Sequence, residues 1–362
     1  MIQKIKAFGL FLLLMVGQMA FGQTNKEEAL AKGKEAIQLI DNGQLEEGIK
    51  LLEASQKLDP DDIIYPYELG YAYYVKKDYK KTVTILDGLL KHKDINDRVY
   101  QLLGNAYDNI GKADKAIATY EAGLKQFPNS GNLYLEMGVM QMAKKNYGKA
   151  LDYYEKGIEV APTFPSNYYW ASKIYLSSDE EVWGMIYGEL FMNMERNSQR
   201  TAEISKLLYD TYKSEIKFIG DTSYTVSFSK NAAISLSDLA NPEKLKLPFG
   251  IGIYEPTLMI SMLGVKSIDI NSLDKIRSDF LDNYFKNGNN EKYPNILFDY
   301  QKQIKEAGHF EAYNHWILMK GDEDGFNKWQ SSNKEKWDHF VKWFTGNSIK
   351  IDETNKFHSR QY

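Results

Sequence analysis

The sequence predicts a mainly all-α protein whose first half is a solenoid of stacked helical hairpins. A small residue recurs every 34 positions, and a second small residue keeps the same step twelve positions later. The first series is Ala36, Gly70, Gly104, Gly138 and Ser172, and the second is Gly48, Thr82, Ala116, Ala150 and Gly184. Two interleaved series indicate repeated pairs of helices, because small side chains let helix backbones approach closely.

The third unit, residues 97–130, shows the pattern of one hairpin most clearly. Its apolar and small residues are Tyr100, Leu103, Gly104 and Tyr107, followed by Ala116, Tyr120 and Gly123, each group at helical spacing. Gly111 separates the two predicted helices. Pro128 ends the second one, because proline lacks the N–H that a helix needs.

This arrangement resembles the tetratricopeptide repeat family over residues 29–198. The residues of the third unit that match the family pattern of aromatic and small residues are Tyr100, Leu103, Gly104, Tyr107, Ala116, Tyr120, Gly123 and Pro128. The proposed units are 29–62, 63–96, 97–130, 131–164 and 165–198. The resemblance implies that the first helix of each unit lines a concave groove that binds a protein or peptide partner.

The first and fifth units depart from the family pattern. Lys32 and Glu35 replace apolar residues in the first, which suits a terminal repeat with one solvated face. Gly188 and Arg196 replace the aromatic residue and the proline in the fifth, so we expect that unit to be distorted.

The candidate binding residues are those that project outward from the packing positions of the first helices. They are Tyr67, Tyr71, Tyr74, Arg98, Gln101, Asn105, Leu135, Val139, Met142, Tyr169 and Lys173. Tyrosines offer rigid contact area with a polar tip, and methionine offers adaptable apolar surface. We expect the amides of Gln101 and Asn105 to bond a bound peptide. The alternative is that many of these side chains only pack against the neighbouring repeat.

Two further regions follow the repeats. Residues 199–219 are predicted to form an amphipathic capping helix, and residues 220–362 a mostly helical domain of no recognised family. Alternation at Tyr224, Val226 and Phe228 predicts one short β element there. The prolines and glycines between 241 and 256 predict a connecting loop. Helices are expected near 257–264, 272–286, 296–307, 309–319, 323–331 and 333–345.

The first 22 residues are predicted to be a secretory signal peptide. Lys4 and Lys6 are followed by a short apolar run and by Ala20-Phe21-Gly22 as the cleavage site. The run is too short to span a bilayer comfortably, and no later segment is apolar enough, so we expect no integral membrane segment after cleavage. Without cysteine the chain has no disulfides. The periplasm is the expected location, with a secreted or envelope-associated protein as the alternative.

The remaining residues favour binding over catalysis. The net charge of −4 gives no reason to expect a nucleic-acid partner. The sequence carries no phosphate loop, nucleophile elbow or cysteine nucleophile, and Glu311 with His315 is too small a set for a metal. We therefore predict a non-enzymatic scaffold without cofactor or metal, of unassigned oligomeric state. The alternative is that residues 220–362 form a domain that the repeats hold in position. That domain would either bind a glycan or peptide or hydrolyse a substrate.

Overall fold

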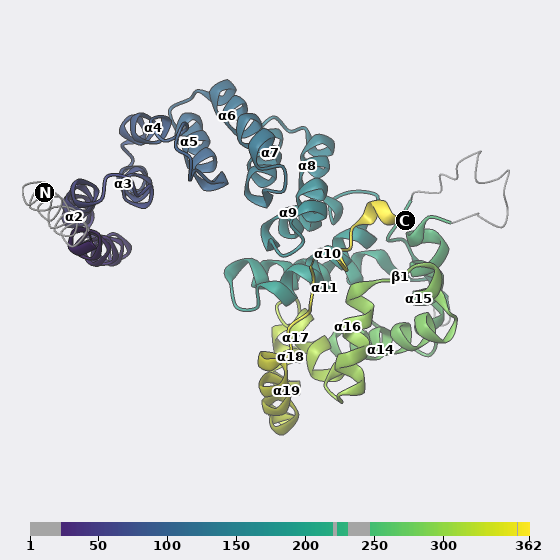
Figure 1. Cartoon of the computed structure of the whole chain (residues 1–362). Helices are drawn as coiled ribbons and strands as arrows, with labels where there is room; N and C mark the ends of the chain where they lie inside the picture. Colours follow the sequence, from purple (N-terminus) through teal and green to yellow (C-terminus); the bar gives the residue numbers. More distant parts are fainter. Residues whose placement is uncertain (1–22, 220–222, 231–246, 353) are drawn as a thin grey trace, which may run out of the picture. The chain divides into compact units, whose positions relative to one another are not determined.

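The computed structural model describes residues 23–219, 223–230, 247–352 and 354–362 (Figure 1). The predicted signal peptide lies outside these residues. The chain forms two compact units, one ending at Met140 and one running from Gln141 to Tyr362. Both are built almost entirely from helices, which confirms the predicted fold class. Across the described residues, no helix combines the length and the apolar character needed to cross a bilayer.

The first unit is a row of paired helices (Figure 1). A helix described over residues 23–41 is followed by α2 (Leu45–Leu58), α3 (Ile64–Val75), α4 (Tyr79–Asp87), α5 (Asp97–Asn109), α6 (Ala113–Gln126) and α7 (Gly131–Ala143), whose last three residues belong to the second unit. Side-chain caps set several of these starts. Asn96 accepts the backbone N–H of Arg98 at α5, and Asp78 accepts that of Lys81 at α4.

The two series of small residues lie where neighbouring helices approach most closely. The Thr82 hydroxyl donates to the carbonyl of Gly70 at 3.2 Å. A Cβ atom on Gly104 would lie 2.2 Å from the ring of Tyr120, and one on Gly48 would lie 2.9 Å from the carbonyl oxygen of Ala36. These distances confirm that the 34-residue pattern marks close helix packing.

The second unit continues the hairpins and then changes architecture. Its first helices are α8 (Tyr147–Val160), α9 (Pro165–Tyr175), α10 (Glu181–Met194) and α11 (Gln199–Glu215). Helices α5, α7, α9 and α11 begin at residues 97, 131, 165 and 199, each 34 after the last. The capping helix α11 therefore stands at the position of a sixth first helix.

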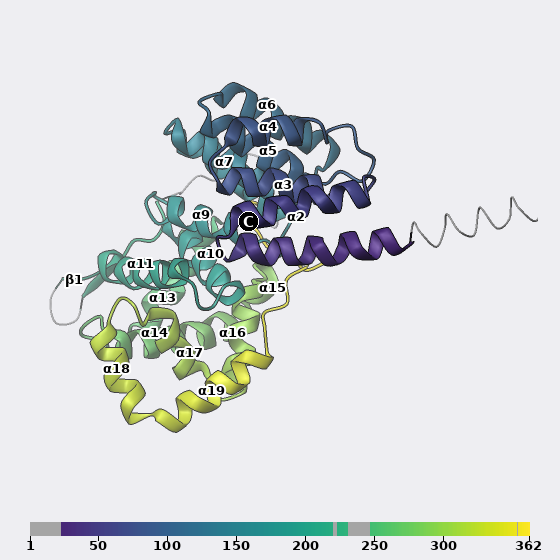
Figure 2. The same ribbon diagram turned by 90° about the vertical axis from the view of Figure 1, so that its left-hand side faces the viewer.

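The rest of the second unit is mostly helical, as predicted. The elements are β1 (Ile216–Phe218), β2 (Tyr224–Val226), the π-helix η2 (Gly250–Tyr254), α13 (Glu255–Ser261), α14 (Ile270–Lys286), α15 (Asn289–Lys292), α16 (Ile296–Glu306), α17 (Phe310–Leu318), α18 (Glu323–Ser332), α19 (Lys334–Gly346) and the 3₁₀ turn η3 (Ser359–Gln361). Helices α16 and α17 pack against α10 and α11 respectively, with α18 and α19 at the outer end (Figure 2).

Two local predictions were wrong. The capping helix ends at Glu215, because residues 216–218 pair antiparallel with β2 instead, placing Ile216 opposite Val226. The expected loop over 241–256 contains a π-helix and the start of α13 in its described part. Gly250 lets this segment pack closely against Ser229, because a Cβ atom on Gly250 would lie 2.4 Å from the Cβ of Ser229.

A buried ion pair joins α10 to the C-terminal helices. Glu189 and Arg277 are 4% and 6% exposed, and their Oε1 and guanidinium nitrogen lie 2.6 Å apart. Gln301 and Tyr313 also donate to Glu189 Oε1, at 2.6 and 2.8 Å. Burial opposes the charge of Arg277, but the nearby Glu189 carboxylate raises the pKa of this guanidinium well above its ordinary value. The fifth repeat and the C-terminal helices therefore share one core.

Candidate functional site

The predicted groove residues of the first unit lie on its first helices α3, α5 and α7. We call this set the first-helix face: Tyr67, Tyr71, Tyr74, Arg98, Gln101, Asn105, Leu135 and Val139. Arg98 is exposed, and Tyr71 and Val139 are 38% and 37% exposed. The other five side chains are half-buried. Tyr71 is therefore the tyrosine of this face that is most open to a partner.

A polar network connects α5 with α7 on this face. The amide of Gln101 donates to Glu136 Oε1 at 2.8 Å, and the amide of Asn105 donates to the same oxygen at 3.4 Å. The Tyr120 hydroxyl donates to Asn105 Oδ1 at 2.5 Å. Gln101 and Asn105 are thus held in place by their neighbours, which fixes the surface that they present.

A second contact joins α3 to α5. The amide of Asn109 donates to the hydroxyl of Tyr74 at 3.1 Å, and the Tyr74 ring packs edge-on against Tyr79 with centroids 5.3 Å apart. Burial raises the pKa of Tyr74 above its ordinary value, so the hydroxyl stays protonated at neutral pH. Successive first helices are therefore linked by side-chain contacts.

Two carboxylates on this face were not among the predicted residues. Burial raises the pKa of Glu68, an effect that Asp41 increases and Arg98 opposes. Burial also raises the pKa of Glu136, while hydrogen bonds from Gln101 and Asn105 lower it. Glu68 and Glu136 stand two repeat steps apart in the sequence, but Leu102 occupies the position between them, so the 34-residue period did not single them out.

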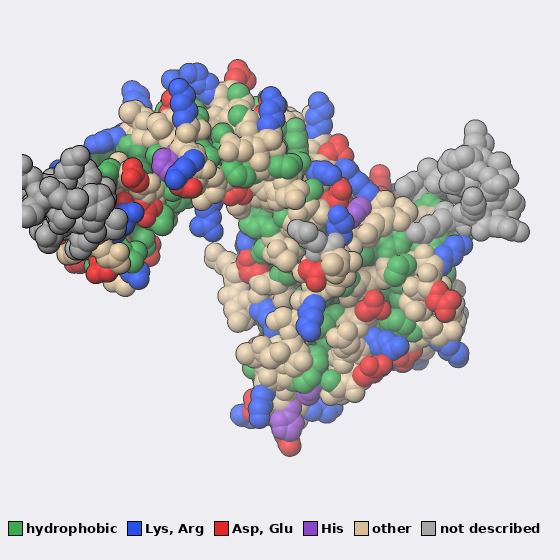
Figure 3. Space-filling view, in the orientation of Figure 1, with side chains coloured by type: hydrophobic (Ala, Val, Ile, Leu, Met, Phe, Trp, Pro, Cys, Tyr) green, Lys and Arg blue, Asp and Glu red, His purple; other side chains and the backbone are tan. Residues whose placement is uncertain are grey.

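Charge is divided unequally between the two kinds of helix in the first unit. The helices α3, α5 and α7 carry Glu68, Asp97, Asp108 and Glu136 but only one basic residue, Arg98. The second helices α4 and α6 carry four lysines, Lys80, Lys81, Lys115 and Lys125, and three carboxylates, Asp87, Asp114 and Glu121. Figure 3 shows blue side chains projecting from the outer edge over α4 and α6. The first-helix face is therefore the more acidic side of these repeats.

The remaining predicted residues belong to the second unit. Lys173 forms an ion pair with Glu203 of α11 at 2.6 Å, and the Tyr169 hydroxyl donates to the same carboxylate. Tyr169 is only 6% exposed, whereas Met142 is half-buried. The helix α11 thus engages Tyr169 and Lys173.

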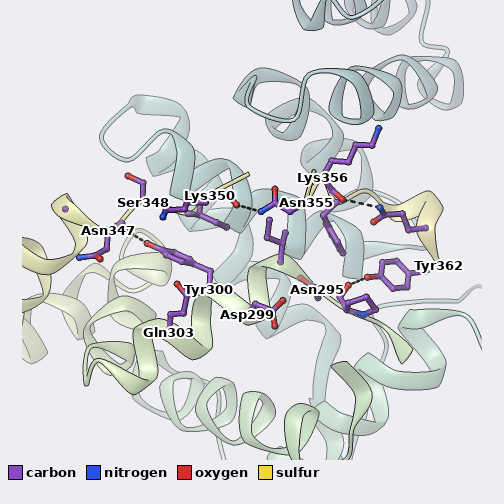
Figure 4. Close-up of a pocket in the computed structure, with 16 residues that line it drawn as sticks. Asn295, Asp299, Tyr300, Gln303, Asn347, Ser348, Lys350, Asn355, Lys356 and Tyr362 are labelled. Atoms are coloured by element: carbon purple, nitrogen blue, oxygen red, sulfur yellow. Dashed lines mark hydrogen bonds between the residues drawn. The ribbon is translucent and has the colours of Figure 1, made fainter. Parts of the chain in front are cut away.

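A cleft of about 880 Å³ lies in the second unit, between α16 and the segment after α19 (Figure 4). Asp299 and Gln303 reach it from α16, and Lys350 and Asn355 reach it from the opposite side (Figure 4). Burial raises the pKa of Asp299. Asn295, which also lines the cleft, is 1% exposed, and its Nδ2 has no hydrogen-bond partner among the described residues. A polar ligand has both room and hydrogen-bonding groups here.

Glu311 and His315 contact side chains of the neighbouring helices α18 and α19. Glu311 accepts from the indole of Trp329 at 2.8 Å and pairs with Lys336 at 2.7 Å. His315 stacks on the ring of Trp329, with centroids 4.0 Å apart. Both side chains therefore serve packing between α17, α18 and α19.

The comparisons with known proteins concern the repeats. A family model described as tetratricopeptide repeat matches residues 102–165. Tetratricopeptide repeat protein 21B of Homo sapiens is 31% identical over 137 residues, which is 37% of this chain and 10% of the human protein. The BBSome complex member BBS4 of Bos taurus is 29% identical over 118 residues, which is 31% of this chain and 22% of that protein. The chain therefore spans less than a quarter of the length of either relative.

Among solved structures, a thermophilic tetratricopeptide-repeat protein of Thermus thermophilus is similar over 50% of this chain and 98% of its own, with 15% identity and a TM-score of 0.43. The sequence match and the 34-residue step of the helices agree on the type of repeat. The chain therefore contains tetratricopeptide repeats, which the family model matches at residues 102–165.

Proposed function

We propose that this protein is a non-enzymatic scaffold of the cell envelope that binds a partner peptide or protein on its first-helix face. The proposal rests on the exposed ring of Tyr71 on α3 and on the amides of Gln101 and Asn105 on the next first helix, α5, which Glu136 and Tyr120 hold in fixed positions. A rigid frame with aromatic and amide groups binds by surface complementarity, because little side-chain entropy is lost on association. No covalent step and no cofactor is part of this proposal.

The charge of the face indicates what the partner carries. Four carboxylates against one guanidinium on α3, α5 and α7 favour a segment with lysine or arginine residues. Glu68 and Glu136 are half-buried, so a cation placed near them would be weakly screened by salt. We therefore propose a cationic segment as the bound element.

The location in the envelope rests on the sequence alone. Residues 1–22 carry the basic start, the apolar run and the small-residue cleavage site of a secretory signal. We propose a periplasmic protein, with the partner in the same compartment.

The test of the groove replaces Tyr71 and Asn105 together by alanine. We expect capture of the native partner from envelope extract to weaken about tenfold or more, because an aromatic anchor and a fixed amide are both removed. The measurement is a pull-down titration, with circular dichroism to show that helical content is retained. Tyr147→Ala removes a ring that is 52% exposed on the second helix α8, and it serves as the matched control. Unchanged capture by the double variant would exclude the groove.

The cleft between α16 and the C-terminal segment supports a second candidate function. Its volume of about 880 Å³ and its polar lining favour a glycan or peptide ligand, with the repeats positioning this domain. Calorimetric titration of the full chain against soluble glycans and peptides tests the idea. Saturable binding that Gln303→Ala weakens would support it, and heats of dilution alone would remove it.

A further inference from the structure

The last six residues, 357–362, return to the helices of the fourth and fifth repeats. We call these residues the tail, and we call the residues of α8, α9 and α10 that contact its polar groups and the ring of Tyr362 the tail site. The tail site consists of Asp152 and Glu155 of α8, Tyr175 of α9, and Trp183 and Tyr187 of α10. The tail and its site both lie in the second unit, and neither contributes to the first-helix face.

One tail residue, Ser359, is recognised through both its side chain and its backbone. Its hydroxyl donates to Glu155 Oε1 at 2.5 Å, and its backbone N–H donates to the hydroxyl oxygen of Tyr187 at 2.7 Å. Tyr187 donates its own proton to Glu155 Oε2 at 2.8 Å. A residue without a hydroxyl at this position would make only one of these two contacts.

Glu155 depends on these hydroxyl groups. It is 2% exposed, and among the described residues no lysine or arginine forms an ion pair with it. A buried carboxylate is costly unless several donors surround it. Tyr175 supplies one donor to Oε1 at 2.8 Å, and Ser359 of the tail completes the set. The site is therefore polar at its centre and built to accept an incoming hydroxyl.

Aromatic and ionic contacts flank this centre. The Tyr362 ring stacks on Trp183 and on Tyr293, with centroids 5.7 and 5.8 Å away. Phe357 is 3% exposed, and its ring centroid lies 6.3 Å from that of Trp183. Arg360 pairs with Asp152 at 2.7 Å. Two aromatic anchors, one serine and one basic residue thus define the recognised sequence.

The residues just before the tail are more exposed to solvent than the tail's aromatic anchors. Asp352, Thr354, Asn355 and Lys356 are all exposed. Asp352 accepts the backbone N–H of Thr354 at 2.7 Å, which makes a local turn. The tail therefore follows a short exposed segment, residues 354–356, whereas Ile351 before that segment is buried.

We propose that the tail site is a peptide-recognition site for a segment with an aromatic residue, a serine two positions on, a basic residue next and a second aromatic residue two positions after that. In the isolated chain its own tail fills the site. The partner that fits is the same tail from a second copy of this chain. Tethering gives the chain's own tail a high effective concentration, so exchange between copies requires that tail to be displaced. This inference does not depend on the proposed function of the first-helix face.

The experiment uses the full chain with Ser359→Asp, which places a second carboxylate against Glu155 and repels the tail from its site. The probe is a fluorescent synthetic peptide with the sequence of residues 350–362. We expect its Kd for the S359D chain to be about tenfold or more below its Kd for the wild-type chain, whose own tail competes. Ser348→Asp adds the same charge at an exposed position before the turn and should behave as wild type.

A matched peptide that carries the aspartate itself should not bind the S359D chain. Two results would overturn the proposal. The first is equal or absent binding of the wild-type peptide to the S359D and S348D chains. The second is loss of the cooperative unfolding transition in S359D, because the tail would then be part of the core rather than an exchangeable ligand.

Discussion

Replacing Glu189 by leucine is expected to lower the free energy of unfolding by about 3–5 kcal/mol, the range for breaking one side of a buried ion pair. The substitution removes an acceptor that holds Arg277, Gln301 and Tyr313 at 2.6, 2.6 and 2.8 Å. Arg277 would then stay in the core without its carboxylate, and its remaining partners are the neutral oxygens of Asn314 and Tyr212. The cost arises mainly from this unpaired buried charge.

Urea denaturation followed by circular dichroism measures the loss. The matched comparison is the double variant Glu189→Leu with Arg277→Met, which removes the charge as well as its partner. We expect the double variant to be more stable than E189L alone, because two apolar side chains of similar size can fill the site. A loss below about 1 kcal/mol in E189L would mean that the pair is open to water, since exposed pairs contribute that little.

Replacing Gly104 by alanine is expected to cost about 1–3 kcal/mol, although alanine is the better helix former. The added methyl group would lie 2.2 Å from the ring of Tyr120, which is 1% exposed and cannot move outward without disturbing its bond to Asn105. The result would appear as a lower midpoint in thermal or urea unfolding.

The control for this substitution is Gly148→Ala. Gly148 lies in the helix α8, and a Cβ atom there meets nothing within 4 Å. Alanine at this position should leave stability unchanged or raise it by less than about 1 kcal/mol. Equal effects at both positions would show that the 34-residue pattern of small residues has another cause than close helix packing.

The repeat region was predictable because its constraints are local and periodic. Small residues such as Gly104 recur at a constant step, and the helix starts at Asp97, Gly131 and Pro165 keep that step. The C-terminal helices were predictable for a similar reason. Phe340 and Phe344 lie four positions apart in the sequence, which predicts that they share one face of a helix. In the structure both side chains are buried on α19.

The polar contacts of the fold were not predictable in the same way. Glu189 meets Arg277 across 88 positions of sequence, and Glu155 meets Ser359 across 204. Such pairs leave no local periodicity, because each partner is one residue on its own helix or turn. The network around Glu136 was missed for the same reason, although Gln101 and Asn105 were identified as site residues. The predicted limits between repeats, cap and C-terminal domain remain predictions.

Photo-cross-linking tests most directly whether the first-helix face holds a protein partner. A benzophenone side chain is placed at Tyr71 of the full chain in its native compartment, and in a second variant at Tyr147, which is 52% exposed on a second helix. The account predicts one defined protein adduct from position 71 and none of the same mass from position 147. The same adducts from both positions, or none from position 71, would contradict it.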